Sequence, residues 1–350
     1  MNKAILTLPM MPVDGKNYGK FVTPIICETL SSIMNANYYH CVNLLDSFND
    51  RTPQINNYID SLEFNGIKYS DLWFDKDNLE KLLDNVYTLI NNGYITEIES
   101  VFYKCDCGVV EIEESKIPTC NPKNLKFRLV NNTVVCNNCN HICKKYKEKI
   151  LIFVPNNVEL NSIIASPFYL NKDLKTYNNI VLNSYVAISR KRNTGIKIKF
   201  NDNFYNIDID FLWSTYLNTF FEKEKVVVSG NRMLYQLFLA AVVEKCLSPN
   251  NKTIILGTPY ITNIKDIVKD LRFKDDVIFR KLFILFNMKW SKKEILYNED
   301  ILKYLNNISD EKRLQLYDII SRANNSDVET ILKSQINMQE CIKKLKLERR

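Results

Sequence analysis

Residues 3–34 read KAILTLPMMPVDGKNYGKFVTPIICETLSSIM, and this stretch decides the fold class that the sequence predicts. Lys3 to Leu8 is a short apolar run, typical of a buried strand, and it leads into Pro and Gly turn residues. From Phe21 to Met34 apolar residues recur at steps of three and four positions, as on one face of a helix. Strand, Gly-containing loop and helix follow in the order that opens a doubly wound α/β sheet.

The same alternation continues further along the chain. Residues 38–45 (YYHCVNLL) predict a second strand, and helical periodicity returns between 55 and 90. Later, residues 226–230 and 253–257 are β-branched runs closed by Gly, with a helix-like segment at 233–247 between them. Strands that alternate with helices in this way predict a parallel sheet.

Cysteine pairs mark the middle of the chain. Cys105-Asp-Cys107 and Cys136-Asn-Asn-Cys139 each offer two thiolates from a tight turn, which suits a tetrahedral zinc ion. Four thiolates would complete the coordination shell, so the predicted zinc is structural rather than catalytic.

The same window holds other possible zinc ligands. Cys120, His141 and Cys143 compete with the paired cysteines, and a scatter of reduced, buried cysteines is the alternative to any metal site. Around this window, from about 101 to 190, the sequence has short β-like runs and no long helical pattern.

We therefore expect an α/β fold: a Rossmann-like doubly wound parallel sheet, split by a small zinc-bearing insertion and followed by a C-terminal helical region. The expected divisions are the first half of the sheet, the zinc-binding insertion, the second half of the sheet and the helical region, at residues 1–100, 101–190, 191–270 and 271–350.

Composition narrows the classes of protein. At 350 residues, with 46% hydrophobic and 25% charged residues, the chain can bury a sizeable core and is not expected to be disordered. Its formal net charge of +7 permits contact with a polyanion without indicating a dedicated nucleic-acid module. We find no secretion signal and no apolar run of the roughly 18 residues that span a bilayer. We expect a cytoplasmic protein with neither a membrane nor DNA as partner.

A family resemblance begins at residue 40. The segment 40–95, HCVNLLDSFNDRTPQINNYIDSLEFNGIKYSDLWFDKDNLEKLLDNVYTLINNGYI, resembles the first half of the glutamyl/glutaminyl branch of class I aminoacyl-tRNA synthetases. An insertion that starts with a Cys-x-Cys pair is similar to the zinc-bearing insertion of that branch, which approaches the tRNA acceptor end. The resemblance covers about residues 3 to 310 and implies ATP with Mg²⁺, an amino acid and tRNA as ligands.

The resemblance also implies a nucleotide site in the first loop. Asn17-Tyr-Gly-Lys20 stands where such enzymes carry a His-x-Gly-His motif that steadies the ATP phosphates. Asn17 can donate a hydrogen bond, and Lys20 can offset phosphate charge, so both are candidate catalytic residues. Pro12, Gly15, Asn17, Gly19 and Lys20 are the nucleotide-binding residues that the resemblance implies.

Two later segments complete the implied site. Lys289-Trp-Ser-Lys-Lys293 is similar to the Lys-Met-Ser-Lys-Ser motif, which makes Lys289 and Lys292 candidate catalytic residues, with a surface turn as the alternative. Gly230 and Arg232 stand near the expected position of the ribose or substrate. Arg232 either meets a carboxylate or phosphate or caps the sheet edge.

The resulting hypothesis is a ligase that activates an amino acid or related carboxylate with ATP and passes it to tRNA or another acceptor. The alternatives are an aminoacyl-tRNA-dependent transferase and a non-catalytic synthetase paralogue that binds tRNA or a partner. The chain has 2 histidines, His40 in a predicted strand and His141 in the cysteine window, so a Ser-His-Asp or Cys-His enzyme is not expected.

Overall fold

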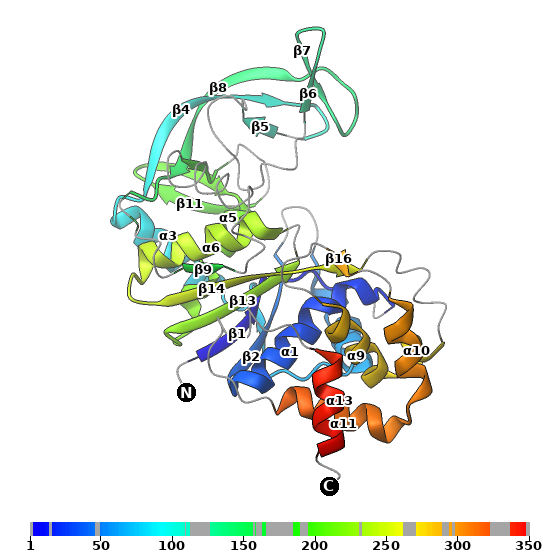
Figure 1. The fold of residues 1–350 in the computed structure, drawn as a ribbon. Helices are drawn as coiled ribbons and strands as arrows, with labels where there is room; N and C mark the ends of the chain where they lie inside the picture. Colours follow the sequence, from blue (N-terminus) through cyan, green and yellow to red (C-terminus); the bar gives the residue numbers. More distant parts are fainter. Residues whose placement is uncertain are drawn as a thin grey trace.

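A six-stranded parallel sheet forms the centre of the computed structural model, with strand order β3-β2-β1-β13-β14-β9 (Figure 1). The strands are β1 (Lys3–Thr7), β2 (Asn37–Val42), β3 (Asp71–Phe74), β9 (Ile163–Ala165), β13 (Glu224–Gly230) and β14 (Lys252–Thr258). The structure describes residues 3–13, 16–45, 50–108, 110–112, 127–156, 158, 163–165, 185–189, 195–230, 233–261, 271–288, 294–295, 298–322 and 337–347. Because the strand order reverses between β1 and β13, the carboxyl ends of these two strands form the switch point at which such sheets bind ligands.

Helices cover both faces of this sheet, because alternate residues of the β-branched strands point to opposite sides. Val226 and Val228 of β13 belong to one core cluster, and Val227 belongs to the other. The first cluster lies under α1 (Val22–Met34), α2 (Ile55–Phe64) and α9 (Val277–Asn287), and the second under α3 (Leu79–Asn91), α5 (Ile209–Ser214) and α6 (Leu234–Leu247). The predicted doubly wound α/β fold is confirmed.

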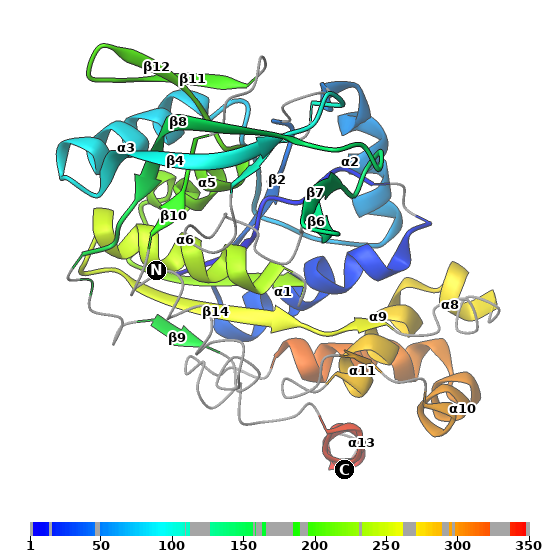
Figure 2. The same ribbon diagram turned by 90° about the horizontal axis from the view of Figure 1, so that it is seen from above.

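A second, antiparallel sheet has the strand order β10-β8-β4-β5, and in the chain its strands come between β3 and β13 of the parallel sheet. Its strands are β4 (Ile95–Lys104), β5 (Val110–Ile112), β8 (Lys144–Phe153) and β10 (Val186–Ala187), and β6 (Phe127–Val130) pairs with β7 (Thr133–Cys136) as a hairpin. We call β4 to β8, residues 95–153, the cysteine module. Figure 1 shows its hairpin standing clear of the main sheet, and Figure 2 shows it over the side of the molecule that holds β2 and α2.

The antiparallel sheet differs in two ways from the predicted insertion at 101–190. It begins at Ile95, because β4 pairs with β8 along its whole length. Strand β9 lies inside that range but pairs with β14 at the edge of the parallel sheet. A hairpin made of β11 (Ile196–Phe200) and β12 (Asn203–Ile207) follows β9 in the chain.

Helices make up most of the described C-terminal part, as predicted. They are α8 (Leu271–Asp275), α9, α10 (Glu299–Asn307), α11 (Asp310–Ser321) and α13 (Met338–Leu347). Strand β15 (Tyr260–Ile261), before α8, pairs with β16 (Glu294–Ile295), between α9 and α10. Lys281 of α9 connects this region to helix α1, because its Nζ donates to both carboxylate oxygens of Glu28, at 2.8 and 2.7 Å. No helix among the described residues is long and apolar enough to cross a membrane.

Candidate functional site

Four cysteine thiols meet at the end of the cysteine module. Cys105 and Cys107 lie in the turn after β4, and Cys136 ends β7 and is followed by Cys139 in the next turn. Their sulfur atoms all lie within 4.8 Å of one another, and this group could hold a metal ion. The Sγ atoms of Cys105 and Cys139 are 3.2 Å apart, and those of Cys107 and Cys136 are 3.7 Å apart.

These distances fit a metal better than a disulfide. A disulfide brings two sulfurs to about 2.05 Å. Zinc–thiolate bonds of about 2.3 Å in a tetrahedron separate the sulfurs by about 3.8 Å. The four thiols are therefore close enough together to form a Cys₄ centre, and zinc fits this type of ligand.

The backbone around the centre explains why these cysteines come together. Gly108 has φ +89, a conformation that favours glycine, and its N–H donates to the carbonyl of Cys105 at 3.0 Å to close the first turn. In the second turn Asn140 has φ 62 and donates to the carbonyl of Cys136 at 2.9 Å. The backbone N–H of Asn138 also donates to the Cys136 sulfur at 3.4 Å, a contact that stabilises a thiolate ligand.

The other candidate zinc ligands are Cys120, His141 and Cys143. Cys143 is buried beside the centre but is not one of the group of four. Burial, followed by the charges of Cys105 and Cys136, raises the pKa of its thiol to about 12. His141 is exposed to solvent, and Cys120 lies outside the described residues.

The opening loop, residues 8–17, leaves the sheet at the switch point. It does not turn away at once, because Leu8 N donates to the carbonyl of Val228 in β13 at 3.1 Å and Met10 N to that of Cys41 in β2 at 2.9 Å. The loop is thus held between the two strands that flank β1. Gly15 lies outside the described residues, and Pro12 is buried.

A short 3-10 turn, η1 (Tyr18–Phe21), connects the opening loop to α1. Residues three apart lie on the same side of such a turn. Tyr18 and Phe21 are both buried, and the Tyr18 ring packs edge-on against Phe273 at 5.6 Å. Asn17 and Lys20 consequently lie on the other side and are exposed, and neither side chain has a hydrogen-bond partner among the described residues.

Buried hydroxyl groups connect the start of α1 to the ends of β13 and β14. The Thr23 and Thr258 Oγ1 atoms are 2.9 Å apart, and Thr258 Oγ1 donates to the carbonyl of Ser229 at 3.3 Å. Gly230 is the next residue, and a Cβ atom built on it would meet no atom of the described residues within 4 Å. The opening loop, the amino end of α1 and the open space above Gly230 thus meet at the carboxyl edge of the sheet.

Three of the other predicted site residues cannot be placed. Arg232, Lys289 and Lys292 all lie outside the described residues. The predictions for these positions therefore stay predictions.

His40 is a core residue. Its two ring nitrogens hydrogen-bond to the hydroxyls of Tyr38, at 2.7 Å, and Tyr58, at 2.9 Å. Burial lowers its pKa to about 3, so the ring is neutral near pH 7. It therefore supplies no exposed imidazole for catalysis.

Sequence reasoning missed the residues that hold the site together. Asp75 follows β3 and accepts hydrogen bonds from Leu44 N at 2.7 Å and from the Trp213 indole at 2.8 Å. Thr23 and Thr258 were missed as well. Each is a common polar residue next to an apolar run, so only the fold reveals its partners.

Comparisons with solved structures support the fold. The chain resembles methionyl-tRNA synthetase of Mycobacterium tuberculosis in complex with methionyl-adenylate, with TM-score 0.59 and 12% identity over 88% of this chain and 69% of that one. The free form of the same enzyme gives TM-score 0.58 and 11% identity over 88% and 66%. No protein-family model matches the chain, and no curated protein does.

The predicted class I aminoacyl-tRNA synthetase fold is thus confirmed. The similar structures are methionyl-tRNA synthetases, however, and give no support to the glutamyl/glutaminyl branch that the sequence suggested. At such low identity the likeness shows the fold and not the activity.

Proposed function

We propose that the protein is a class I aminoacyl-tRNA synthetase-like ligase, which activates an amino acid or related carboxylate with ATP and Mg²⁺ and transfers it to tRNA or another acceptor. The observation that carries the proposal is the opening loop at the switch point of the sheet, beside open space above Gly230. Ligands of open α/β sheets bind at this position, and the similar methionyl-tRNA synthetase is bound to methionyl-adenylate.

For the activation step, the protein mainly has to position the two substrates and stabilise the negative charge on the phosphates. The substrate carboxylate oxygen forms a bond to the α-phosphorus of ATP, the bond between that phosphorus and the bridging oxygen breaks, and pyrophosphate leaves. Lys20 would offset the phosphate charge and Asn17 would donate a hydrogen bond to it, because both are exposed on the same side of η1. Lys289 and Lys292 are proposed to act on the pyrophosphate, and Gly230 and Arg232 to face ribose or substrate.

The cysteine module is proposed to hold one structural zinc ion through Cys105, Cys107, Cys136 and Cys139. Four thiolates leave no position for a water or a substrate on the metal. The module would then serve as a rigid projection that meets the acceptor end of tRNA. The expected site of action is the cytoplasm.

A specific observation supports the alternatives. The motif position that carries histidines in the resembled family has Asn17 and Lys20 here. A transferase that receives a ready-made aminoacyl-tRNA, or a non-catalytic binding paralogue, would need no ATP chemistry at this position.

Amino-acid-dependent exchange of labelled pyrophosphate into ATP separates these functions. We expect exchange with one amino acid, reduced about 100-fold in Lys20→Ala, since removing one charge-stabilising donor has an effect of this order. Lys81→Ala is the matched control, because Lys81 is exposed on α3, on the other face of the sheet. No exchange with any amino acid, together with retained tRNA binding, would reject the ligase in favour of an alternative.

A further inference from the structure

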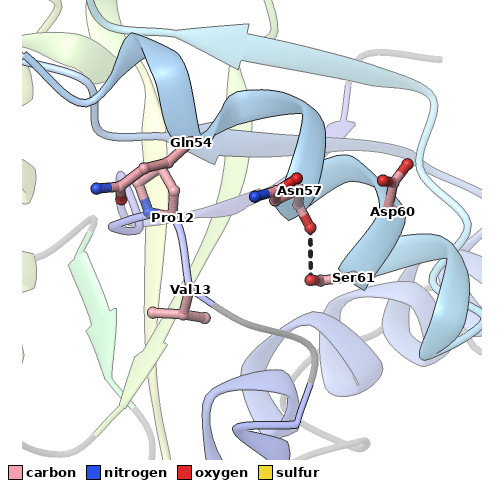
Figure 3. A pocket seen from close by; sticks show the side chains of 6 residues that line it. All are labelled: Pro12, Val13, Gln54, Asn57, Asp60 and Ser61. Atoms are coloured by element: carbon pink, nitrogen blue, oxygen red, sulfur yellow. Dashed lines mark hydrogen bonds between the residues drawn. The ribbon is translucent and has the colours of Figure 1, made fainter.

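An open cavity of about 430 Å³ lies on the outer side of the opening loop, between that loop and α2. Pro12 and Val13 form the loop side (Figure 3). The other lining residues belong to α2 and to the 3-10 turn before it, η2 (Thr52–Gln54), and they are Gln54, Asn57, Asp60 and Ser61. A cavity of this size accommodates a small molecule.

Helix α2 presents a polar stripe to this cavity. Gln54, Asn57 and Ser61 follow one another at steps of three and four, which places them on one side of the helix. Tyr58 and Leu62 lie on the adjoining side of the helix and are buried in the core. In Figure 3 Gln54 lies beside Pro12 at one end of the stripe, and Asp60 lies at the other end.

The polar groups of the stripe differ in their partners. The Ser61 hydroxyl donates to the carbonyl of Asn57 at 2.6 Å, and the Asn65 amide donates to the carbonyl of Ser61 at 2.8 Å. The side chains of Gln54, Asn57 and Asp60, by contrast, make no hydrogen bond or ion pair with another residue that the structure describes. Three polar side chains beside one cavity are therefore available to a ligand.

The lining defines the ligand's chemistry. Among the lining residues that the structure describes, Asp60 is the one charged side chain, and none is Lys or Arg. Ser61 has used its hydrogen and can only accept, so the lining offers an excess of oxygen acceptors. A phosphate or carboxylate would find no positive charge here, whereas a primary ammonium group has three donors and a complementary charge.

We propose that this cavity binds a small molecule through a primary ammonium group, which Asp60 pairs with while the amide oxygen of the neighbouring Asn57 accepts a hydrogen bond. Pro12 and Val13 supply an apolar wall for its carbon chain. The ammonium group can belong to an amino acid, which rests on the function proposed above, or to a free diamine. The site lies across the opening loop from the switch point, so its occupant contacts the loop that leads to Asn17 and Lys20.

Calorimetric titration of the full chain without ATP tests this proposal. The probes are the twenty standard amino acids and putrescine at low ionic strength, each repeated with Asp60→Asn and with Asp84→Asn, a control at an exposed site on α3. We expect one probe to bind the parent chain and Asp84→Asn equally, and Asp60→Asn at least tenfold more weakly, because a charge-assisted hydrogen bond is lost. The N-acetylated form of an amino-acid probe should not bind.

Each result of the titration either supports or overturns the proposed ammonium site. If the probe that binds is an amino acid, the ammonium group in the cavity belongs to an amino acid. If the probe that binds is putrescine, the ammonium group belongs to a free diamine. Binding by no probe, or binding that Asp60→Asn leaves unchanged, overturns the proposal. Because the titration omits ATP, Asp60-dependent binding without any pyrophosphate exchange would reject the ligase alone, whereas exchange with no Asp60-dependent binding would reject the cavity alone.

Discussion

The cysteine module and the carboxyl edge of the parallel sheet hold their candidate ligands by different means. In the module, four like side chains converge within 4.8 Å, so the chemistry is contained in the side chains themselves. At the sheet edge, buried groups such as Thr23 and Thr258 fix the frame, while Asn17 and Lys20 extend from it toward solvent. If the four thiols hold the proposed zinc ion, the cysteine end of the module depends on that ion for its order, whereas the sheet edge depends on the packed core beneath it.

This difference predicts that each region can be damaged without the other. Around the cysteines the module has few buried apolar residues, so we expect the proposed metal to stabilise this end of it. The sheet is buried on both faces and needs no metal.

The largest expected effect is on metal binding. Cys136→Ser removes one of four thiolates, and structural zinc sites have apparent binding free energies of about 10–16 kcal/mol. We expect the zinc content measured by metal analysis to fall from one per chain to near zero, with proteolytic cleavage appearing between residues 105 and 143.

Cys341→Ser is the matched control, because Cys341 is buried in the main core, away from the module. It should keep its zinc. An unchanged one-to-one zinc content in Cys136→Ser would refute the ligand assignment.

The second effect concerns the sheet. Lys225 of β13 and Glu244 of α6 are both 0% exposed, and Lys225 Nζ lies 2.6 Å from the Glu244 carboxylate. Glu244→Gln leaves a buried cation without its counter-charge, so we expect a loss of about 3–5 kcal/mol in the free energy of unfolding, measured with urea.

An exposed pair provides the comparison. Glu299→Gln breaks the contact with Lys303 on α10 at 3.2 Å and should cost less than about 0.5 kcal/mol. Equal losses in the two variants would show that the buried pair is unimportant, and loss of zinc from Glu244→Gln would show that the two regions are not independent.

The third prediction concerns the pH dependence of the core. Because burial lowers the His40 pKa from 6.5 to about 3, the neutral ring stabilises the fold fully above about pH 6.5 and this stability is lost as the pH falls toward 3. Between pH 6.5 and 5 the loss is about 2 kcal/mol for one such group. Urea unfolding at both pH values should show this extra loss in the parent chain and not in His40→Gln.

His141 is the natural control, since it is exposed in the cysteine module. His141→Gln should keep the whole pH dependence. A loss of stability that persists in His40→Gln would assign it to groups other than His40. The buried carboxyls of Glu28 and Asp75 would not cause it, because burial raises their pKa values and lowering the pH would then stabilise the fold.

Much of the frame could be predicted from the sequence, because its signals are local. Runs such as residues 226–230 end in polar residues or Gly where β13 ends, and periodic apolar residues mark α1 and α3. Cys105, Cys107, Cys136 and Cys139 were recognisable as candidate ligands because they occur in two close pairs.

What could not be predicted depends on contacts between distant segments. Strand β9 is a short apolar run that joins the edge of the sheet only because β14 leaves an edge to pair with. The stripe at Gln54, Asn57 and Asp60 reads in the sequence as the solvated side of a helix, since the loop that faces it is more than forty residues earlier.

The smallest expected effect concerns the hydroxyl pair of Thr23 and Thr258, which connects the start of α1 to the end of β14. Thr23→Val keeps the shape of the side chain and removes the bond to Thr258, whose own hydrogen remains bonded to the Ser229 carbonyl. We expect a loss of about 1 kcal/mol in the free energy of unfolding, which Thr23→Ser restores, and an unchanged zinc content. The stabilisation by ATP in thermal unfolding should also decrease, because the start of α1 is no longer held to β14.

Thr215→Val is the matched control. It removes a buried hydroxyl bonded to the carbonyls of Leu82 and Leu212 on the other face of the sheet, and it should lose comparable stability without changing the response to ATP. A decrease in the ATP response that is equal in Thr23→Val and Thr215→Val would mean that general stability, and not the hydroxyl pair, controls the edge.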